Sequence, residues 1–359
     1  HIFPAVSIAN AIKELDPQAE ILFIGALGRM EMERVPQAGY DIIGLPIQGF
    51  NRSQPWKNIS VMINLIRSLA KAKKVIRNFR PDVGVGVGGY ASGAAMRVAA
   101  KMGIPILLQE QNGFAGLTNK MLKNDAAKIC VAYENMERFF PKEKIILTGN
   151  PVRQNLTQGT KANALPYLQQ EFGKTFDEAH KTLLIIGGSL GARTINESLM
   201  KDIEQLLDKD IQVIWQTGKI YFDKLHEQLT QQGLWDNPRL IVTPFISNMP
   251  DVYALADLVI SRAGASSISE LCLLGKPSVL VPSPNVAEDH QTHNAMALVN
   301  KQAAVLVKDI EAGEKLVPTA LELIADDAQL KTLHTNVLKL AQTNSATRIA
   351  QEVIKLCQH

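Results

Sequence analysis

A glycine-rich run in the second half of the chain has the residue types needed to hold a phosphate group. Residues 187–191 read Gly-Gly-Ser-Leu-Gly; they follow the apolar run Leu183–Ile186 and precede a helical pattern that begins near Ala192. Glycines let the backbone approach a ligand closely, and free N–H groups at the start of a helix attract phosphate. Packing alone also places glycines at such turns. The expected diphosphate cradle consists of Gly188, Ser189, Leu190 and Gly191.

A second glycine-rich run, residues 86–93, also stands between a candidate strand and a candidate helix. Two such loops suit a donor and an acceptor that both carry phosphate. A dinucleotide site is disfavoured, because the strand that follows residues 187–191 ends Trp-Gln-Thr at Thr217, without the acidic residue that such a site needs. A P-loop is excluded, because Gly275-Lys276 is followed by proline instead of Ser or Thr.

Polar side chains follow two further candidate strands. Glu270 stands about one turn into a helix with a Ser-rich start, where a carboxylate can accept two hydroxyl groups of a ribose, or serve only the helix dipole. Residues 288–294 (Glu-Asp-His-Gln-Thr-His-Asn) come after a strand's carboxyl end, where ligands of open α/β sheets bind. Sugar hydroxyls need such partners. No metal site is expected, because His290 and His293 lack a third ligand at metal spacing.

Short apolar segments alternate with longer amphipathic ones along the whole chain. This pattern is typical of βαβ units whose parallel strands are buried on both faces, so we expect an α/β fold of parallel sheets flanked by helices. The expected strands are 21–25, 41–45, 83–87, 104–108, 128–132 and 145–148, then 182–187, 212–217, 240–244, 258–261, 278–281 and 304–307.

A length of 359 residues exceeds what one hydrophobic core usually serves, so two domains are expected. The turn signal Gly-Asn-Pro at 149–151 and the polar stretch 154–181 place the boundary near Pro151. We expect an N-terminal domain at 1–151, a C-terminal domain at 152–342, and a last helix within 343–359. That helix could pack on either domain, including back on the N-terminal one.

The composition fits a globular protein outside the bilayer. Hydrophobic residues make up 46% and charged residues 20% of the chain, and no window approaches the roughly 18 apolar residues of a membrane span. A net charge of +3 is too small to imply nucleic-acid binding. Cys130, Cys272 and Cys357 lie far apart, which fits a reducing compartment and argues against structural zinc.

The ordered motifs together resemble the MurG family of bacterial transferases, which move N-acetylglucosamine (GlcNAc) from UDP to undecaprenyl-diphosphate-linked muramyl-pentapeptide. The resemblance covers nearly the whole chain and rests on residues 1–5, 86–93, 109–119, 149–153, 187–193, 261–270 and 289–294. It implies a GT-B fold, two Rossmann-like domains with a cleft between them. It also implies an inverting enzyme that needs no cofactor and converts lipid I to lipid II in peptidoglycan synthesis, as a peripheral protein on the cytoplasmic face of the inner membrane.

The same resemblance implies that UDP-GlcNAc is bound mainly by the C-terminal domain. The uracil is expected at the backbone near Phe245 and Ile246, the ribose at Glu270, and the diphosphate at the Ser189 loop. The sugar is expected at Gln291 and Asn112. His290 replaces the first of two adjacent glutamines that the family often carries, which puts one sugar contact in question. The remaining members of the expected donor set are Arg153, whose charge suits the leaving diphosphate, and Ala265.

The acceptor is expected in the N-terminal domain. His1 is the leading candidate for the base that takes the acceptor's proton, because imidazole titrates near neutrality and the family places this residue beside the acceptor. Glu110 is the second candidate, and His1 could instead only support a loop. The family has a strand and a glycine loop before this histidine, so we expect that the chain omits an existing segment. The expected acceptor contacts are His1, Gly88, Gly89 and Tyr90.

A basic segment without Asp or Glu runs from residue 42 to residue 81. Apolar residues recur in it at helical spacing, at positions 59, 62, 63, 66, 69 and 70. Such an element can lie on anionic lipid, where each basic residue contributes about 1 kcal/mol, or it can bury its apolar face as ordinary core. The expected membrane-binding residues are Phe50, Trp56, Lys71, Lys73, Lys74 and Arg77.

Two other functions share parts of this pattern. A UDP-sugar 2-epimerase has the two domains and phosphate loops, but it would leave the second glycine run and the basic segment without a purpose. A non-catalytic nucleotide-sugar-binding subunit is disfavoured by the acceptor-side motifs at 86–93 and 109–119.

Overall fold

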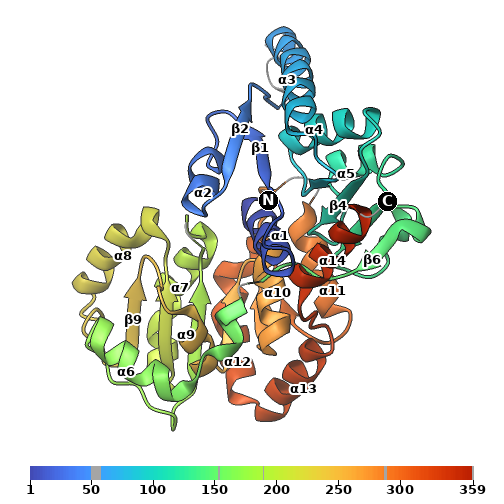
Figure 1. The fold of residues 1–359 in the computed structure, drawn as a ribbon. Coiled ribbons are helices and arrows are strands. Elements are labelled where there is room, and N and C mark those ends of the chain that lie inside the picture. The colour runs from blue at the N-terminus through green and yellow to red at the C-terminus, as the bar shows by residue number, and fades with distance from the viewer. Residues whose placement is uncertain (50–57, 153, 189, 287–288, 358–359) are drawn as a thin grey trace. The chain divides into compact units, whose positions relative to one another are not determined.

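The computed structural model describes residues 1–49, 58–152, 154–188, 190–286 and 289–357. The chain forms two compact units, one of His1–Val152 with Thr343–His359 and one of Arg153–Gln342, here called the N-terminal and C-terminal units (Figure 1). The last helix, α14 (Ser345–Cys357), packs against α1 (Ile2–Leu15) in the N-terminal unit. Within the described residues, no helix is long and apolar enough to cross a membrane.

The C-terminal unit contains a six-stranded parallel sheet with the order β12-β11-β10-β7-β8-β9. This is the strand order of a doubly wound sheet. The chain builds outward from β7 through β8 to β9, then returns to the middle of the sheet and builds from β10 through β11 to β12 in the other direction, so the winding reverses between β7 and β10. Its strands are β7 (Thr182–Ile186), β8 (Gln212–Gln216), β9 (Leu240–Thr243), β10 (Leu258–Ser261), β11 (Ser278–Leu280) and β12 (Val305–Leu306).

Helices cover both faces of this sheet, because successive strand residues point to opposite sides and both sets are buried. Leu183 and Ile185 pack in one core with residues of α7 and α12, whereas Leu184 between them is equally buried on the other face. The helices of the unit are α6 (Lys161–Phe172), α7 (Arg193–Leu207), α8 (Lys219–Gln231), α9 (Met249–Leu255), α10 (Ala265–Leu274), α11 (His290–Val299), α12 (Ala312–Ala325) and α13 (Asp327–Leu338).

The N-terminal unit carries its described strands in two parallel sheets, a β1-β2 pair and a four-stranded sheet with the order β3-β4-β5-β6. The strands are β1 (Leu22–Ala26), β2 (Asp41–Leu45), β3 (Gly84–Gly86), β4 (Ile106–Glu110), β5 (Lys128–Val131) and β6 (Ile145–Leu147). The remaining α-helices are α2 (Glu31–Gln37), α3 (Asn58–Phe79), α4 (Tyr90–Lys101) and α5 (Leu117–Leu122).

Two apolar layers enclose the β3–β6 sheet. On one face, Ala72 of α3 and Ala95 of α4 share a core with Leu108 of β4. On the other face, Leu107 packs with residues of α1 and α14, including Ile349. The last helix is therefore part of this unit's core, although it follows the whole C-terminal unit in the sequence.

Each expected strand overlaps an observed one, and the bounds of β2 and β10 are as predicted. The prediction for β4 was wrong by two residues at each end. The strand runs on through Gln109 and Glu110, which are buried and pair with Cys130 and Val131 of β5. A search for apolar runs stops at Leu108, because it cannot recognise polar residues that are buried in a strand.

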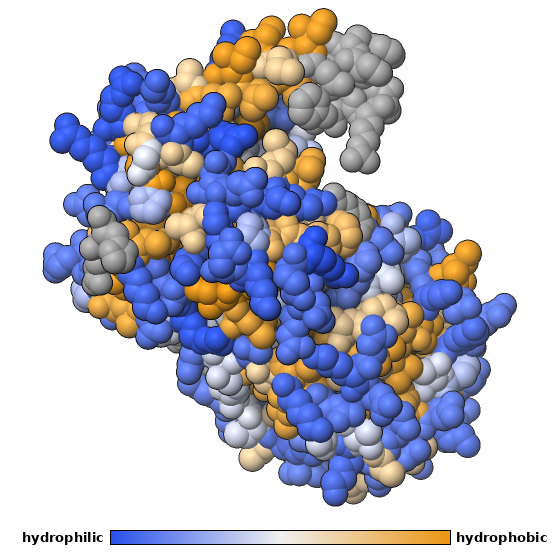
Figure 2. All heavy atoms as spheres, turned by 90° about the vertical axis from the view of Figure 1, so that its right-hand side faces the viewer, coloured by the Kyte–Doolittle hydropathy of each residue, from blue (hydrophilic) through white to orange (hydrophobic). Residues whose placement is uncertain are grey.

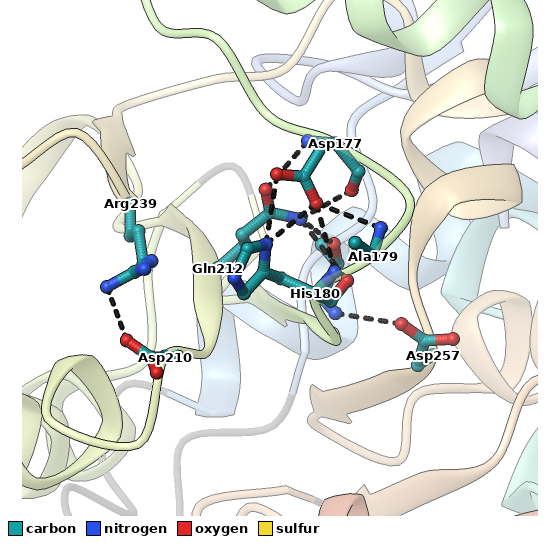
Figure 3. A network of polar contacts seen from close by, with 8 residues as sticks. Asp177, Ala179, His180, Asp210, Gln212, Arg239 and Asp257 are labelled. Carbon is teal, nitrogen blue, oxygen red and sulfur yellow. Dashed lines mark hydrogen bonds and ion pairs between the residues drawn. The ribbon is translucent and has the colours of Figure 1, made fainter.

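A polar network ties together the strand starts of the C-terminal sheet (Figure 3). Gln212 donates to Asp177 O at 2.9 Å and to Thr182 Oγ1 at 3.0 Å, and its own oxygen accepts from Asp177 N at 2.8 Å. Thr182 N donates to Asp257 at 2.8 Å, and the His180 ring hydrogen-bonds Asp177, which lowers the pKa of that carboxyl. These contacts hold the loop before β7 at the amino ends of the strands, away from the carboxyl ends where the glycine loop lies.

Candidate functional site

The strand order of the C-terminal unit predicts where a ligand binds. In doubly wound sheets, ligands bind beyond the carboxyl ends of the strands at the point where the winding reverses, here between β7 and β10. The glycine loop 187–191 follows β7, and the Ser-rich start of α10 follows β10. The sequence motifs for the diphosphate and the ribose therefore meet at this edge of the sheet.

The glycine loop depends on backbone conformations that favour glycine. Gly188 and Gly191 have φ values of +78° and +84°. Gly218, after β8, lies so close to the loop that an added Cβ would stand 2.2 Å from Gly191 N. Only glycine at 218 allows the two turns to approach in this way. Ser189 of the expected cradle lies outside the described residues, and Leu190 is exposed.

Asn196 ties α7, the helix that follows the glycine loop, to β8 and to the turn after it. Its side-chain amide donates to Thr217 O at 2.9 Å, and its oxygen accepts from Trp215 Nε1 at 2.9 Å. The N-cap residue of α7, Ala192, makes no side-chain hydrogen bond to the helix start in the described part of the chain. The first-turn N–H groups of α7 are the kind of donor that a phosphate group binds.

Glu270 is a buried carboxylate on α10, not a surface glutamate. It is 8% exposed, and Tyr253 of α9 donates its hydroxyl to Glu270 Oε2 at 3.0 Å. Sequence reasoning missed Tyr253, because a buried aromatic residue in a short helix looks like ordinary core. Its position 17 residues before Glu270 carries no signal of the contact.

Gln291, expected to contact the sugar, has its amide orientation fixed by the backbone. Its Oε1 accepts from Ala263 N at 3.2 Å and from Ser283 N at 2.9 Å. Because backbone N–H groups can only donate, the oxygen must face them, and the NH₂ group points elsewhere. Gln291 is therefore suited to donate a hydrogen bond to a sugar oxygen. Its neighbour His290 begins α11 and is half-buried.

Arg262 connects the loops around Gln291. It donates to Val281 O at 3.1 Å and to Pro282 O at 3.3 Å, and it forms a partly buried ion pair with Asp309. Asp309 also accepts from Thr194 Oγ1 at 3.0 Å, which links this cluster to the first turn of α7. These contacts hold the ends of β10 and β11 and the start of α7 together.

The loop after β9 supplies the residues expected beside the uracil. Phe245 is 54% exposed, whereas Ile246 is 1% exposed, so the Ile246 side chain is not available to a ligand. Thr243 Oγ1 donates to Phe245 O at 2.8 Å and fixes this turn. Ala265, also in the expected donor set, is the first residue of α10.

The N-terminal unit brings His1 and the glycine run 86–93 together. An added Cβ on Gly88 would lie 2.8 Å from His1 Cε1, so the imidazole lies directly against this residue, which has φ +98°. His1 Nδ1 lies 2.9 Å from Gln111 Oε1. Gly89 precedes α4, whose first residue Tyr90 is 57% exposed. His1 therefore lies against Gly88 and Gly89, and Tyr90 is the next residue along the chain.

Glu110 has the contacts of a carboxylate that holds a loop. It is 3% exposed, and it accepts hydrogen bonds from Asn112 N at 3.1 Å, Gly116 N at 3.0 Å and Asn119 Nδ2 at 2.9 Å. Burial raises its pKa above the ordinary value, and the three donors oppose that shift. Its second-choice role as a base is disfavoured, because both oxygens are occupied within the loop 111–116.

The remaining expected site residues differ in whether the structure describes them. Arg153 and the aromatic residues Phe50 and Trp56 lie outside the described residues. Asn112, expected to touch the sugar, lies in the N-terminal unit. In the described part of the chain, no group of three His, Cys, Asp or Glu side chains could hold a metal ion.

Comparison with known proteins gives matches over both units. The model of the glycosyltransferase family 28 N-terminal domain matches residues 1–131, and that of the family's C-terminal domain matches residues 182–353. A relative from Bacteroides thetaiotaomicron is 60% identical over 361 residues, which cover 100% of this chain and 95% of the relative. The chain belongs to glycosyltransferase family 28. It is therefore an enzyme, a glycosyltransferase.

Two of the matched relatives share one specific name. The B. thetaiotaomicron protein and a Bacteroides fragilis relative, 59% identical with coverage of 100% of this chain and 93% of the relative, are both named UDP-N-acetylglucosamine--N-acetylmuramyl-(pentapeptide) pyrophosphoryl-undecaprenol N-acetylglucosamine transferase. The crystal structure of Acinetobacter baumannii MurG, 25% identical, superposes with a TM-score of 0.78 over 99% of this chain and 96% of that one.

The same fold occurs in a different enzyme class. A UDP-GlcNAc 2-epimerase from Neisseria meningitidis, in a structure with bound UDP-GlcNAc, is 16% identical and superposes with a TM-score of 0.65 over 99% of this chain and 96% of that one. This family 28 member thus has the GT-B fold, as the sequence motifs implied.

Proposed function

We propose that this glycosyltransferase moves GlcNAc from UDP-GlcNAc to the C4 hydroxyl of the muramyl sugar in undecaprenyl-diphosphate-linked muramyl-pentapeptide. The observation that carries the proposal is the 60% identity, across the whole chain, with a relative named for this transfer. Shared fold alone would not decide it, because 2-epimerases have the same fold. The residues at the two glycine loops support the proposal from the chain's own chemistry.

The C-terminal unit is proposed to bind the donor. The glycine loop and the start of α7 offer N–H groups to the diphosphate, with Ser189 and Arg153 assigned to the same group. Glu270, held by Tyr253, accepts the ribose hydroxyls, and the Phe245-Ile246 backbone contacts the uracil. The remaining proposed donor contacts are Ala265, His290, Gln291 and Asn112, the last two for the sugar.

The proposed chemistry is one displacement at C1 of GlcNAc with inversion. The acceptor's C4 oxygen forms the new bond to C1 as the bond from C1 to the UDP oxygen breaks. Backbone N–H groups stabilise the negative charge that develops on the leaving diphosphate. His1 takes the proton of the C4 hydroxyl as general base, and Gly88, Gly89 and Tyr90 bind the acceptor.

Helix α3 supports docking of the enzyme on a membrane. Ile59, Met62, Ile63 and Ile66 are each at least 47% exposed, so these four do not form ordinary core, whereas Leu69 is partly buried and packs against the core of the unit. A different face of the helix, including Ala72, packs into the unit. Figure 2 shows hydrophobic atoms at the end of the N-terminal unit where α3 lies in Figure 1.

Basic residues continue the same exposed face of α3 toward its C-terminal end. Lys73, Lys74 and Arg77 lie about two to three turns after Ile66 and are exposed, as expected for residues that meet anionic headgroups. Lys71 differs, because its ammonium donates to Gly44 O at 2.7 Å and so supports the end of β2. We propose peripheral binding at the cytoplasmic face of the inner membrane, where a lipid-linked acceptor would be available.

Product analysis tests the proposed reaction. UDP-GlcNAc is mixed with a short-chain lipid-linked muramyl-pentapeptide, with the acceptor omitted as a control. The proposal predicts UDP and a lipid product that is heavier by one N-acetylhexosamine, formed only with acceptor. Conversion of UDP-GlcNAc to its 2-epimer without acceptor, or no product at all, would contradict it.

A further inference from the structure

A chain of buried amide side chains lies behind His1 in the N-terminal unit. Asn150 donates from Nδ2 to the backbone carbonyl of Gln111 at 2.9 Å, and Gln109 donates from Nε2 to Asn150 Oδ1 at 2.9 Å. Gln111 in turn donates from Nε2 to Val87 O at 2.9 Å and to Gln109 O at 3.2 Å. The side chains of Gln109 and Gln111 also hydrogen-bond each other.

The backbone carbonyls determine the orientation of these amides. A carbonyl oxygen can only accept, so the NH₂ group of Gln111 must face Val87 and Gln109. The reversed amide would set its oxygen against both carbonyl oxygens with no hydrogen between them, which is costly in a buried site. Gln111 Oε1 therefore faces His1 Nδ1, 2.9 Å away.

This orientation determines which nitrogen of His1 carries the proton. Because Gln111 Oε1 has no hydrogen to donate, the hydrogen bond forms only if Nδ1 carries the hydrogen. In the neutral imidazole, Nε2 then has the free lone pair. The ring also lies against Gly88, which fixes the position of the ring. Gln111 fixes which of its nitrogens carries the hydrogen.

We propose that Gln111 is a positioning residue that keeps His1 in the Nδ1–H tautomer, so that Nε2 is the atom that accepts the proton of the acceptor hydroxyl. The role in turnover rests on the proposed transfer reaction. The tautomer itself does not, because it follows from the hydrogen bonds of the enzyme without substrate. Gln109 and Asn150 act further back, by holding the amide of Gln111 in its orientation.

Nitrogen NMR on the histidine rings tests the tautomer directly. The chain has seven histidines, so selective ¹⁵N labelling gives a small set of ring signals, and the set lost in His1→Ala identifies residue 1. At a pH where the ring is neutral, we expect a protonated Nδ1 and an unprotonated Nε2 in the unsubstituted enzyme. A protonated Nε2 would overturn the proposal, whether or not the enzyme shows transfer.

Kinetics of Gln111→Leu tests the role in turnover. Leucine fills similar space without the oxygen, so the ring should shift toward the Nε2–H form, and kcat should fall about ten- to hundred-fold while KM for UDP-GlcNAc changes little. Gln18→Leu, at an exposed position of the same unit, is the matched control and should leave kcat unchanged. An unchanged kcat in a folded Gln111→Leu enzyme would overturn the proposal. If the unsubstituted enzyme transfers nothing, it is the proposed function that fails.

Discussion

Polar side chains at both candidate sites are held by protein partners that decide which atoms a ligand can meet. The oxygen of Gln291 is bound by two backbone N–H groups, so its amide nitrogen is the available atom. The carboxylate of Glu270 is held by Tyr253, and that of Glu110 by its own loop. Removing a partner should therefore alter binding or loop structure even where the partner itself touches no substrate.

Tyr253→Phe tests the support of Glu270. The substitution removes one hydroxyl that donates to a buried carboxylate, and a hydrogen bond to a charged group contributes about 1.5–3 kcal/mol. We expect the Kd for UDP-GlcNAc to rise about ten-fold or more in titration calorimetry. Tyr40→Phe, which loses a hydroxyl contact to Asn10 at 2.8 Å in the other unit, should bind the donor normally. Equal affinity in both variants would argue against the support.

Glu110→Gln tests whether Glu110 acts as the base or only holds its loop. The new NH₂ group would face an N–H donor, so we expect a loss of about 1–3 kcal/mol in the free energy of unfolding and slower turnover. The acid limb of the kcat–pH profile should remain, because the proposed base is His1. Loss of that limb in Glu110→Gln, together with near-normal turnover in His1→Ala, would make Glu110 the base instead.

Lys276 gives a pH dependence of stability. Its Nζ donates to Ala256 O at 2.9 Å, and burial lowers its pKa from 10.5 to about 8. Between these two values the unfolded chain holds a proton that the folded protein has lost, so the residue's contribution to stability rises with pH. Denaturant unfolding between pH 7 and pH 10.5 should show this rise in the unsubstituted protein relative to Lys276→Met. If the free energies of unfolding of the two proteins changed in parallel with pH, this role of Lys276 would be refuted.

At the scale of elements, the loops at the strands' carboxyl ends position the site. The sequence motifs predicted the loops after β3, β7 and β10, because glycine and polar residues after an apolar run are local signals. The supporting contacts are not local. Gly218 comes from the turn after β8, and nothing in its own segment shows that Gly191 lies against it.

Gly218→Ala tests this close approach. A Cβ at 218 would stand 2.2 Å from Gly191 N, so the diphosphate loop must shift, and we expect UDP affinity to fall more than about ten-fold. Gly233→Ala is the matched control. It also has a positive φ, +70°, but an added Cβ there meets nothing within 4 Å. Both variants should lose some stability, but only Gly218→Ala should lose UDP binding. If the two variants bound UDP with comparable affinity, the proposed cradle would be contradicted.

Helix α3 gives the element-scale prediction for the membrane. Reversing two charges in Lys73→Glu with Lys74→Glu should weaken co-sedimentation with anionic vesicles at least about 30-fold, since each basic residue lost from the surface contributes about 1 kcal/mol and the new carboxylates are repelled by anionic lipid. The same double change at the exposed Lys224 and Lys331 of the C-terminal unit serves as control. Binding that responds to neither lipid charge nor salt would exclude this role for α3.

At the scale of the whole molecule, the strand pattern could be predicted because parallel strands buried on both faces appear as short apolar runs. The place of the last helix could not, since Ile349 packs in the N-terminal unit after the chain has completed the other one. Gln111 lay within a recognised motif, yet its role needed the positions of Val87 and Gln109. Sequence therefore indicates the chemistry of the site, and the structure identifies which atoms remain available for it.

The proposed direct transfer is tested most directly by following a ¹³C label at C1 of the GlcNAc in UDP-GlcNAc. The account predicts that the label appears in the lipid product in the β configuration at the muramyl C4 oxygen, with one UDP released for each label transferred. A product that keeps the α configuration, or a label that stays on the nucleotide as the 2-epimer, would contradict it.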